Sequence, residues 1–258
     1  MTKADRPLGI LCAMAEEMAL LADAMADRSA GERAGVPIAT GRLDGCDVVL
    51  AESGIGKVGA ALAATLLLDR FACRSLIFTG VAGGLDPALG IGDIVIAERL
   101  IQHDYGAVVG EAHVAFRGGD FPLGEARRDP AFALDPLLLE RLKTALAEYA
   151  PPRLAASVIG EEKGRQPQLV FGTVVTGDIF VNSAAMRERL HERWSAQAVE
   201  MEGAAVAQVA ERFGVPVIVI RALSDLAGAE SHMDFGQFLD VASEAAADVV
   251  RRVVRIVG

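Results

Sequence analysis

The sequence predicts an α/β protein with a central mixed or parallel sheet and helices on both faces of that sheet. Strand-like runs alternate with helical stretches along the chain, and several of these runs are nearly continuous Val, Ile and Leu. Uninterrupted apolar runs are typical of strands covered on both faces, and strand–helix alternation is typical of folds that place helices there. With 258 residues, of which 52% are apolar, the chain can bury a sizeable core.

The individual elements are predicted in chain order from apolar runs and from helical spacing. The predicted strands, each bounded by turn residues, are Leu8–Cys12, Asp47–Glu52, Ser75–Thr79, Asp93–Ala97, Val170–Thr176 and Val215–Ala222. The predicted helices, with apolar residues at spacings of three and four, are Glu16–Met25, Lys57–Phe71, Asp135–Tyr149, Ala184–Arg193, Glu202–Phe213 and Phe235–Ile256. Asp104–Pro130 and Pro151–Gln168 are rich in Gly and charge and are predicted to be loops. Since no repeat and no long linker interrupts the pattern, residues 1–258 are predicted to form a single domain.

The charge balance excludes several classes of function. Asp and Glu number 35 against 25 Lys and Arg, so the net charge is −10 and the pI is near 4.9. A nucleic-acid-binding protein needs a basic face for phosphate, so no nucleic-acid partner is predicted. Aromatic residues make up only 5% of the chain, which also argues against base-stacking platforms.

Cysteine usage and apolar stretches predict a cytoplasmic protein without a membrane partner. Cys12, Cys46 and Cys73 are few and scattered, which indicates neither a disulfide framework nor a zinc site. The start of the chain lacks the cleavage pattern of a secretory signal. The longest apolar stretch, Val58–Leu68, is far shorter than the ~20 residues needed to span a bilayer.

A glycine-rich segment fits the pattern GxGxxG but not its usual context. Gly54, Gly56 and Gly59 follow a predicted strand and open a predicted helix. A dinucleotide site needs an acidic residue at the end of the next strand, where this chain instead has the TGVAGG segment that begins at Thr79. The segment is therefore predicted to be a tight turn into a helix, whose backbone N–H groups are still able to touch a ligand.

Carboxylates occur at three apparent strand-to-helix junctions, at the edge where open α/β sheets bind their ligands. Glu17 can take a proton from water or simply favour a helix N-terminus. Glu200 is interpreted as a helix cap, whereas Glu202 can accept two hydrogen bonds from a vicinal diol such as that of ribose. Asp225 ends the strand that contains Arg221, either as a functional acid or only as a cap. Acids at three strand ends favour one shared cleft. The histidines have no metal-ligand spacing, so no metal is predicted; they are His103, His113, His191 and His232.

Short motifs run in order from near the start of the chain to near its end. They are AMAEEM (Ala13–Met18), SGIGKV (Ser53–Val58), TGVAGGLDPALGIGD (Thr79–Asp93), TGDIFVN (Thr176–Asn182), VEMEGAA (Val199–Ala205), RALSDLA (Arg221–Ala227) and Ser231–Phe235. Together they resemble the 5′-methylthioadenosine/S-adenosylhomocysteine nucleosidases of the nucleoside phosphorylase/hydrolase superfamily. Each motif alone is weak, and their combination is specific.

The resemblance implies a fold, an activity and a set of partners. The fold is a three-layer αβα sandwich with a central mixed sheet, and the assembly is a homodimer. The activity is hydrolysis of the N-glycosidic bond of 5′-substituted adenosines to adenine and a 5′-substituted ribose. The partners are a small-molecule nucleoside and water, and no cofactor is implied.

The resemblance also implies which residues act in catalysis. Glu17 would activate the attacking water, with Arg221 supporting both. Asp225, positioned by Ser224, would protonate or hydrogen-bond N7 of adenine. A general acid or base of this kind typically contributes ~10²–10⁴-fold to a rate.

Further residues are implied in binding the substrate. Glu202, helped by the backbone of Met201, would bind the ribose hydroxyls. The remaining residues would line the site. Phe180 would stack on the base, and the Val181 backbone would meet the base edge. Apolar walls would come from Met14, Ile55 and Phe235, with Phe235 in its own site or in that of the partner.

Two departures from the family pattern leave the 5′ substituent open. Val81 stands where the family often has Ser beside the sugar and water, which removes one hydrogen bond. The segment Tyr105–Gly172 matches poorly, and in the family it includes parts that shape the 5′ pocket. Methylthioadenosine, adenosylhomocysteine, 5′-deoxyadenosine and aminodeoxyfutalosine all remain candidate substrates.

Two other functions remain open as alternatives. A phosphate-dependent nucleoside phosphorylase needs cationic or neutral donors for phosphate beside the anomeric carbon, where Glu17 would repel the dianion. Arg221 or the unassigned loops are the candidate sources of such a donor. A non-catalytic nucleoside-binding protein would keep the pocket without needing Glu17.

Overall fold

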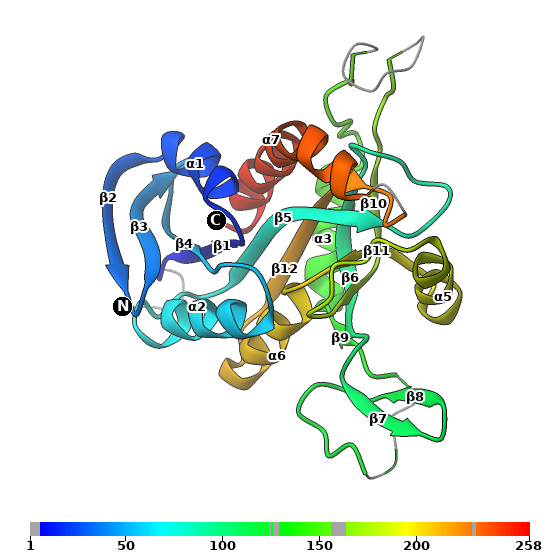
Figure 1. The fold of residues 1–258 in the computed structure, drawn as a ribbon. Helices are drawn as coiled ribbons and strands as arrows, with labels where there is room; N and C mark the ends of the chain where they lie inside the picture. The colour runs from blue at the N-terminus through cyan, green and yellow to red at the C-terminus, as the bar shows by residue number, and fades with distance from the viewer. Residues whose placement is uncertain (1–5, 124, 126–128, 156–163, 229–230) are drawn as a thin grey trace.

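A ten-stranded mixed sheet forms the centre of the molecule in the computed structural model, which describes residues 6–123, 125, 129–155, 164–228 and 231–258 (Figure 1). Its strands are β1 (Leu8–Cys12), β2 (Ala26–Arg33), β3 (Val36–Leu43), β4 (Cys46–Glu52), β5 (Leu76–Gly84), β6 (Ile94–Gln102), β9 (Phe132–Ala133), β10 (Leu169–Thr176), β11 (Ala196–Glu200) and β12 (Val217–Asp225). A separate hairpin consists of β7 (Gly106–Val109) and β8 (Ala112–Ala115). The described helices are α1 (Ala15–Asp23), α2 (Lys57–Asp69), α3 (Pro136–Leu146), α5 (Ala184–Trp194), α6 (Gly203–Phe213) and α7 (Ser231–Val257).

The strand order brings the ends of distant chain segments together. The order is β11-β10-β6-β12-β5-β1-β4-β3-β2, with β9 added to β6. Strands β4, β1, β5 and β12 are mutually parallel, and β6 runs antiparallel to β12. Strand β11 pairs with β10 and also crosses onto the end of β5 through Val199 and Gly83. The carboxyl ends of β5, β11 and β12 therefore lie next to one another.

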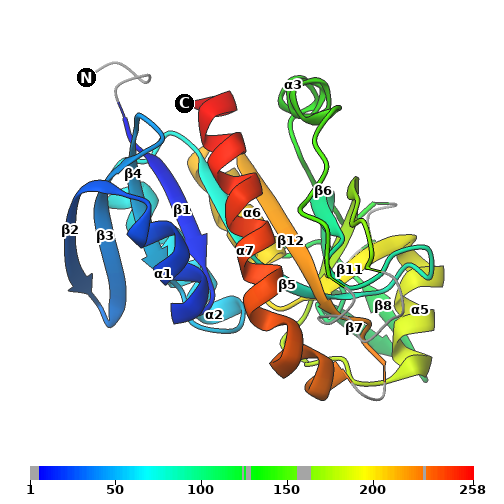
Figure 2. The ribbon, with the colours of Figure 1, turned by 90° about the horizontal axis from the view of Figure 1, so that it is seen from above.

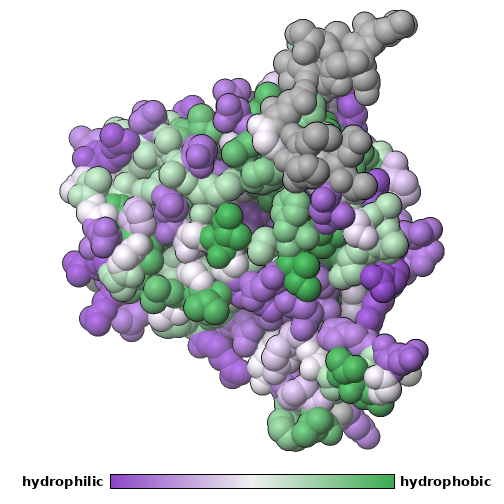
Figure 3. Space-filling view, viewed as in Figure 1, coloured by the Kyte–Doolittle hydropathy of each residue, from purple (hydrophilic) through white to green (hydrophobic). Residues whose placement is uncertain are grey.

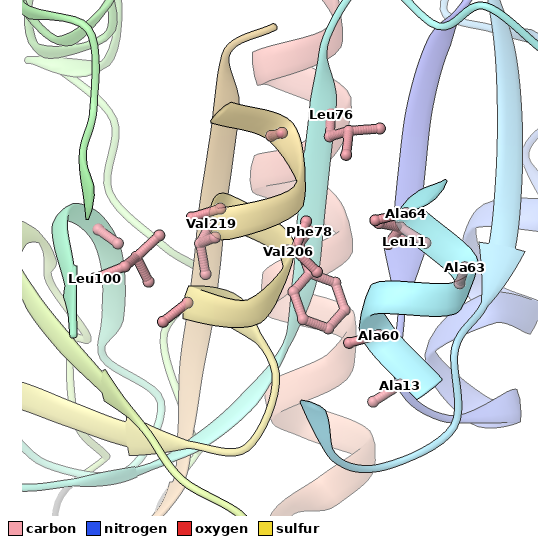
Figure 4. Close-up of a cluster of buried hydrophobic side chains, with 14 of the residues drawn as sticks. Leu11, Ala13, Ala60, Ala63, Ala64, Leu76, Phe78, Leu100, Val206 and Val219 are labelled. Atoms are coloured by element: carbon pink, nitrogen blue, oxygen red, sulfur yellow. The ribbon is translucent and has the colours of Figure 1, made fainter. Parts of the chain in front are cut away.

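The helices form a layer on each face of the sheet. Helices α2 and α6 cover one face, and α1 and α7 cover the other (Figures 1 and 2). Alternate residues of each strand point to opposite faces, so Leu11 and Phe78 pack with α2 and α6 (Figure 4), whereas Ile10 and Ile77 pack with α7. The predicted three-layer αβα sandwich with a central mixed sheet is confirmed.

The prediction that β5 ends at Thr79 was wrong. The strand continues through the glycine-rich TGVAGG segment to Gly84. Glycines weaken a strand when it is considered alone, but here β12 and β11 pair with the segment and supply its ladder hydrogen bonds. Pairing between residues far apart in the chain decided the structure of this segment.

Several strands were missed. β2 is exposed along its whole length and has the polar sequence ADRSAGER, so it shows no apolar run, and β3 pairs with it at the sheet edge. β11 has only five residues, and its sequence resembles a junction between a strand and a helix. The predicted loop 104–130 contains the hairpin of β7 and β8.

The described part of the second predicted loop, 151–168, contacts the central sheet. Leu154 and Arg165 form an isolated antiparallel bridge, and Arg165 donates to buried Asp93 at 2.5 Å. Residues 156–163 lie outside the described part of the chain. The single-domain organisation stays a prediction. Among the described helices, none is both long and apolar enough to cross a bilayer.

Candidate functional site

All of the residues predicted to act on a substrate line one cavity of about 190 Å³. They are Met14, Glu17, Ile55, Val81, Phe180, Val181, Met201, Glu202, Arg221, Ser224, Asp225 and Phe235. The cavity lies where β5, β11 and β12 end, as expected for ligand sites of α/β sheets. A wider groove of about 800 Å³ lies between α3 and α6 and contains none of these residues.

Glu17 is held at the start of α1 with its carboxylate turned inward. The side chain is only 4% exposed, and its Oε2 accepts hydrogen bonds from the backbone N–H groups of Ala13 and Met14 at 2.9 and 3.1 Å. Its Oε1 accepts a third from the N–H of Val81 on β5 at 3.2 Å. Burial raises the pKa of Glu17, and Arg221 and these N–H groups oppose the rise. A buried carboxylate with a raised pKa is suited to taking a proton from water.

Glu202 stands at the N-cap of α6 and faces the start of α2. Its Oε1 accepts a hydrogen bond from the Gly56 N–H at 2.7 Å, and its Oε2 lies 3.5 Å from Arg221 Nη2. Burial, followed by the nearby charge of Glu200, raises the pKa of Glu202 to about 7. The carboxylate is therefore close to its titration point at neutral pH.

Asp225 ends β12 and is 3% exposed. Its Oδ1 accepts a hydrogen bond from the Ala227 N–H at 2.8 Å, and the hydroxyl of Ser224 donates to Oδ2 at 3.1 Å. The Ser224 contact agrees with the positioning role that the resemblance implies. These bonds fix the carboxyl group at the cavity wall.

Glu200 and Arg221 form a buried ion pair beneath the cavity. Arg221 is 1% exposed, its Nε and Nη2 both donate to Glu200 Oε2, and its guanidinium lies over the Phe78 ring at 4.2 Å. Burial lowers the pKa of Arg221, but the carboxylates of Glu200 and Glu202 outweigh burial and raise it. Arg221 is thus a permanent cation among acids. The structure gives no hydrogen bond between its guanidinium and Glu17.

Glu200 is a cap, as the sequence predicted. Its Oε2 accepts hydrogen bonds from the N–H groups of Glu202 and Gly203 at 3.2 and 2.7 Å, which are the first free donors of α6. The Thr176 hydroxyl at the end of β10 donates to its other oxygen. Glu200 also reaches the cavity wall.

Aromatic and aliphatic side chains form the outer walls of the cavity. Phe180 lies in the connection between β10 and α5, and its ring meets that of Phe235 edge to face with centroids 6.2 Å apart. Phe235 therefore lines the cavity of its own chain. Ile55, Ile179 and Phe180 are 63%, 52% and 48% exposed, so this wall is open to the surface.

The glycines of the GxGxxG segment have local structural roles. Gly54 and Gly56 have φ values of +69° and +97°, in the left-handed region that favours glycine. A Cβ at Gly59 would lie 2.4 Å from the Ser53 carbonyl oxygen. The segment is the predicted turn into a helix. Its N–H groups at Gly56 and Lys57 donate hydrogen bonds to the carboxylates of Glu202 and Asp178, respectively.

Gly80 lets two charged groups approach the strand. A Cβ at this position would lie 2.7 Å from Arg221 Nη1 and 2.8 Å from Glu17 Oε1. Any larger residue would push these groups apart. This gives a physical reason for the first glycine of the TGVAGG segment.

A group of polar residues that contact one another or the acids of the site was not predicted from the sequence. Asp178 and Thr176 belong to the TGDIFVN motif, Lys57 belongs to SGIGKV, and Asp104 lies in a predicted loop. The two motifs were a signal that could have drawn attention to Asp178 and Lys57. Nothing in the local sequence marks Asp104, which is brought to them by the fold.

The comparisons with known proteins agree with this geometry. Residues 7–255 match the model of the phosphorylase superfamily. The 5′-methylthioadenosine/S-adenosylhomocysteine nucleosidase of Mycobacterium bovis is 43% identical over 96% of this chain and 97% of its own.

Solved structures extend the likeness to the fold. The nucleosidase of the same name from S. pneumoniae, bound to the transition-state inhibitor MT-ImmA, is 31% identical with a TM-score of 0.80, covering 98% of this chain and 100% of its own. The futalosine hydrolase of Helicobacter pylori is 30% identical with a TM-score of 0.79, covering 97% of each chain. From the family model, the full-length identity and the shared fold, the chain belongs to the phosphorylase superfamily and, within it, to the 5′-methylthioadenosine/S-adenosylhomocysteine nucleosidase family.

Proposed function

We propose that this protein cleaves 5′-substituted adenosines with water, releasing adenine and a 5′-substituted ribose, by means of the three acids at its cavity. The observation that carries the proposal is the convergence of Glu17, Glu202 and Asp225 from three separate elements on one cavity beside Phe180. As a member of a nucleosidase family, the chain is a hydrolase that acts on N-glycosidic bonds.

Glu17 is the proposed general base. Both of its oxygens are already fixed by backbone N–H groups, so little reorganisation is needed when it accepts a proton. Burial raises the pKa of Glu17, which makes its carboxylate a stronger base than an exposed glutamate. Water between Glu17 and the anomeric carbon is the nucleophile.

Asp225 is the proposed general acid. Adenine leaves poorly as an anion, so N7 must receive a proton or a strong hydrogen bond as the glycosidic bond lengthens. The Ser224 hydroxyl, 3.1 Å from Asp225 Oδ2, orients the carboxyl group. Phe180 stacks on the base, and the Val181 backbone meets its edge.

Glu202 is the proposed acceptor for the ribose 2′- and 3′-hydroxyls, with the Met201 backbone beside it. The developing oxocarbenium ion is positive, and it lies between the carboxylates of Glu17 and Glu202. Arg221 lowers the pKa of both acids and so opposes the effect of their burial.

Hydrolysis is favoured over phosphorolysis by the charges at the cavity. Among the described residues that line it, Arg221 is the only cationic side chain. Glu200 and Glu202 already hold that guanidinium at 2.5 and 3.5 Å. A phosphate dianion would meet Glu17 without a free cation to receive it. The phosphorylase alternative therefore has less support than it had from the sequence.

The test is adenine release from a panel of 5′-substituted adenosines. Methylthioadenosine, adenosylhomocysteine, 5′-deoxyadenosine and aminodeoxyfutalosine are each incubated with the protein, and adenine is measured by chromatography. Catalytic release from at least one compound is expected, and the ratio of kcat/KM values ranks the 5′ groups. Stoichiometric binding of these compounds without adenine release would instead establish a non-catalytic binder.

We also propose that the protein is a cytoplasmic homodimer. The free thiols of Cys12, Cys46 and Cys73 suit a reducing compartment. Exposed apolar side chains at Ile55, Val58 and Leu62 lie next to the cavity rim on one side of α2. A second copy of the chain that covered these residues would remove them from water.

A further inference from the structure

We propose that Asp178 is a positioning residue which, together with Lys57 and Asp104, fixes the segment that carries Phe180 relative to Glu202. The inference rests on the proposed function, because it assigns Phe180 to the base and Glu202 to the ribose. Asp178 itself does not line the cavity. It acts through the N-terminus of α2, which lies between the two binding groups.

Asp178 caps α2 from a distant part of the chain. Its Oδ1 accepts a hydrogen bond from the Lys57 N–H at 2.8 Å. The two residues are separated by 121 positions in the sequence, so this contact joins the segment after β10 to the segment after β4. Phe180 lies two residues beyond Asp178, and its position is therefore tied to the first turn of α2.

The neighbouring N–H, that of Gly56 at the start of α2, is bonded to Glu202. The Gly56 N–H donates to Glu202 Oε1 at 2.7 Å, one residue before the N–H that Asp178 accepts. A Cβ at Gly56 would lie 3.2 Å from Asp178 Oδ1, so the carboxylate packs directly on this turn. Two consecutive backbone donors thus set the distance between the Phe180 segment and the ribose carboxylate.

Lys57 and Asp104, neither of which lines the cavity, complete this arrangement. Lys57 Nζ lies 2.7 Å from Asp104 Oδ1 and 3.7 Å from Asp178 Oδ2. Asp104 Oδ2 accepts a hydrogen bond from the Asp178 N–H at 2.9 Å. The side chains of Lys57 and Asp104 are each 18% exposed, which limits solvent screening of their ion pair. Asp178 is therefore held through both its backbone and its side chain.

The proton-transfer groups are held by other contacts. Glu17 is fixed by Ala13, Met14 and Val81, and Asp225 is fixed by Ser224 and Ala227. None of these bonds involves the α2 N-terminus. Loss of Asp178 should consequently weaken substrate binding while leaving the chemical step nearly intact.

The experiment compares Asp178→Ala with Asp178→Asn and with a matched cap elsewhere. D178A removes the acceptor, so KM for the best substrate should rise about tenfold, as expected for losing a hydrogen bond to a charged group. Its kcat should stay within about threefold of the parent value. D178N keeps an oxygen acceptor and should restore KM to within about twofold, because Asn and Asp cap helices equally well.

Asp135→Ala is the matched control. Asp135 caps α3 by accepting a hydrogen bond from the Leu138 N–H at 2.9 Å, away from the cavity. D135A loses a cap of the same kind, so it should lower the melting temperature without changing KM. Lys57→Met keeps its backbone N–H and should raise KM only about threefold, as expected for a partly exposed ion pair.

Any of four results would overturn the inference. D178A could show an unchanged KM, or a fall in kcat at unchanged KM. D178N could be as impaired as D178A, or D135A could show an equal rise in KM. Failure of the proposed function is detected separately, because the parent protein would then release no adenine. In that case the dissociation constant of 5′-methylthiotubercidin, an adenosine analogue with carbon in place of N7, replaces KM as the readout.

Discussion

At the residue scale, the site is a group of buried carboxylates around one buried arginine. Glu17, Glu200 and Glu202 are each no more than 5% exposed, and Arg221 is 1% exposed. Acids in such a position are costly unless they are paired or used. Glu200 has the full set of partners that a structural acid needs, whereas the second oxygen of Glu202 faces Arg221 at the longer distance of 3.5 Å. This difference separates the structural acid from the proposed substrate ligand.

The proposed proton-transfer roles predict the effect of isosteric amides. Glu17→Gln removes the base and Asp225→Asn removes the acid, so each should lower kcat by about 10²–10⁴-fold. Both keep the size of the side chain, and binding of 5′-methylthiotubercidin should stay measurable by calorimetry. Adenine release in single-turnover experiments is the measurement. A variant with parental kcat would show that its residue transfers no proton in the rate-limiting step.

The raised pKa of Glu202 predicts how stability depends on pH. In the folded protein its pKa is about 7 instead of 4.5, so the folded state holds a proton that the unfolded chain releases between these values. Stability contributed by this group therefore falls as the pH rises from 4.5 to 7, by about 3 kcal/mol in all. Glu202→Gln carries no titrating group and should lose this dependence.

Urea denaturation of both proteins measures this effect. The free energy of unfolding of E202Q minus that of the parent should be about 3 kcal/mol larger at pH 8 than at pH 5. Other groups titrate equally in both proteins and cancel in the comparison. An equal difference at the two pH values would mean that Glu202 is ionised throughout.

At the element scale, Glu200 connects four secondary-structure elements. It ends β11, accepts hydrogen bonds from the first N–H groups of α6, receives the Thr176 hydroxyl of β10 and pairs with Arg221 of β12. Glu200→Ala leaves a buried guanidinium without its main partner and should cost about 3–5 kcal/mol in the free energy of unfolding. Urea denaturation measures the loss.

An exposed acid provides the control for this prediction. Glu192 lies on the surface of α5, and Glu192→Ala should change the free energy of unfolding by no more than about 0.5 kcal/mol. A loss in Glu200→Ala as small as that in Glu192→Ala would show that the pair with Arg221 adds little to stability.

The elements that the sequence predicted correctly are those with strong local signals. β1 and β4 are apolar runs, and α7 has a continuous apolar stripe. The elements it missed depend on partners far away in the chain, such as β2, whose side chains are all exposed, and the glycine-rich end of β5. The apolar and aromatic lining residues came from the resemblance alone, whereas the three acids at the cavity were predictable because carboxylates in apolar motifs are conspicuous. Their contacts were not, since the bond from Gly56 to Glu202 spans 146 positions.

At the scale of the whole molecule, the sheet gathers the carboxyl ends of several strands at one edge and leaves apolar side chains on the surface beside them. On the face shown in Figure 3, hydrophobic residues occur in patches among hydrophilic ones. Val58 on α2 is 84% exposed, and Ile55 at the cavity rim is 63% exposed. Such a surface next to a site is suited to contact with a second copy.

The proposed homodimer predicts the effect of a charge on α2. The parent protein should sediment at twice its 27.0 kDa, and Val58→Asp should sediment as a monomer because a buried unpaired carboxylate opposes association. Leu137→Asp places the same charge on α3 at a side chain that is 83% exposed and should stay dimeric. Sedimentation velocity at several concentrations measures both. A parent protein that sediments as a monomer at all of them would contradict the proposal.

The reaction itself is tested most directly by the dependence of turnover on phosphate. Purified protein is incubated with methylthioadenosine, or with the best substrate of the panel, in the presence and absence of phosphate, and the products are separated by chromatography. The arrangement of Glu17 and Arg221 predicts adenine and free methylthioribose at equal rates in both incubations. Adenine that appears only with phosphate, together with a sugar 1-phosphate, would contradict the assignment of water as the nucleophile.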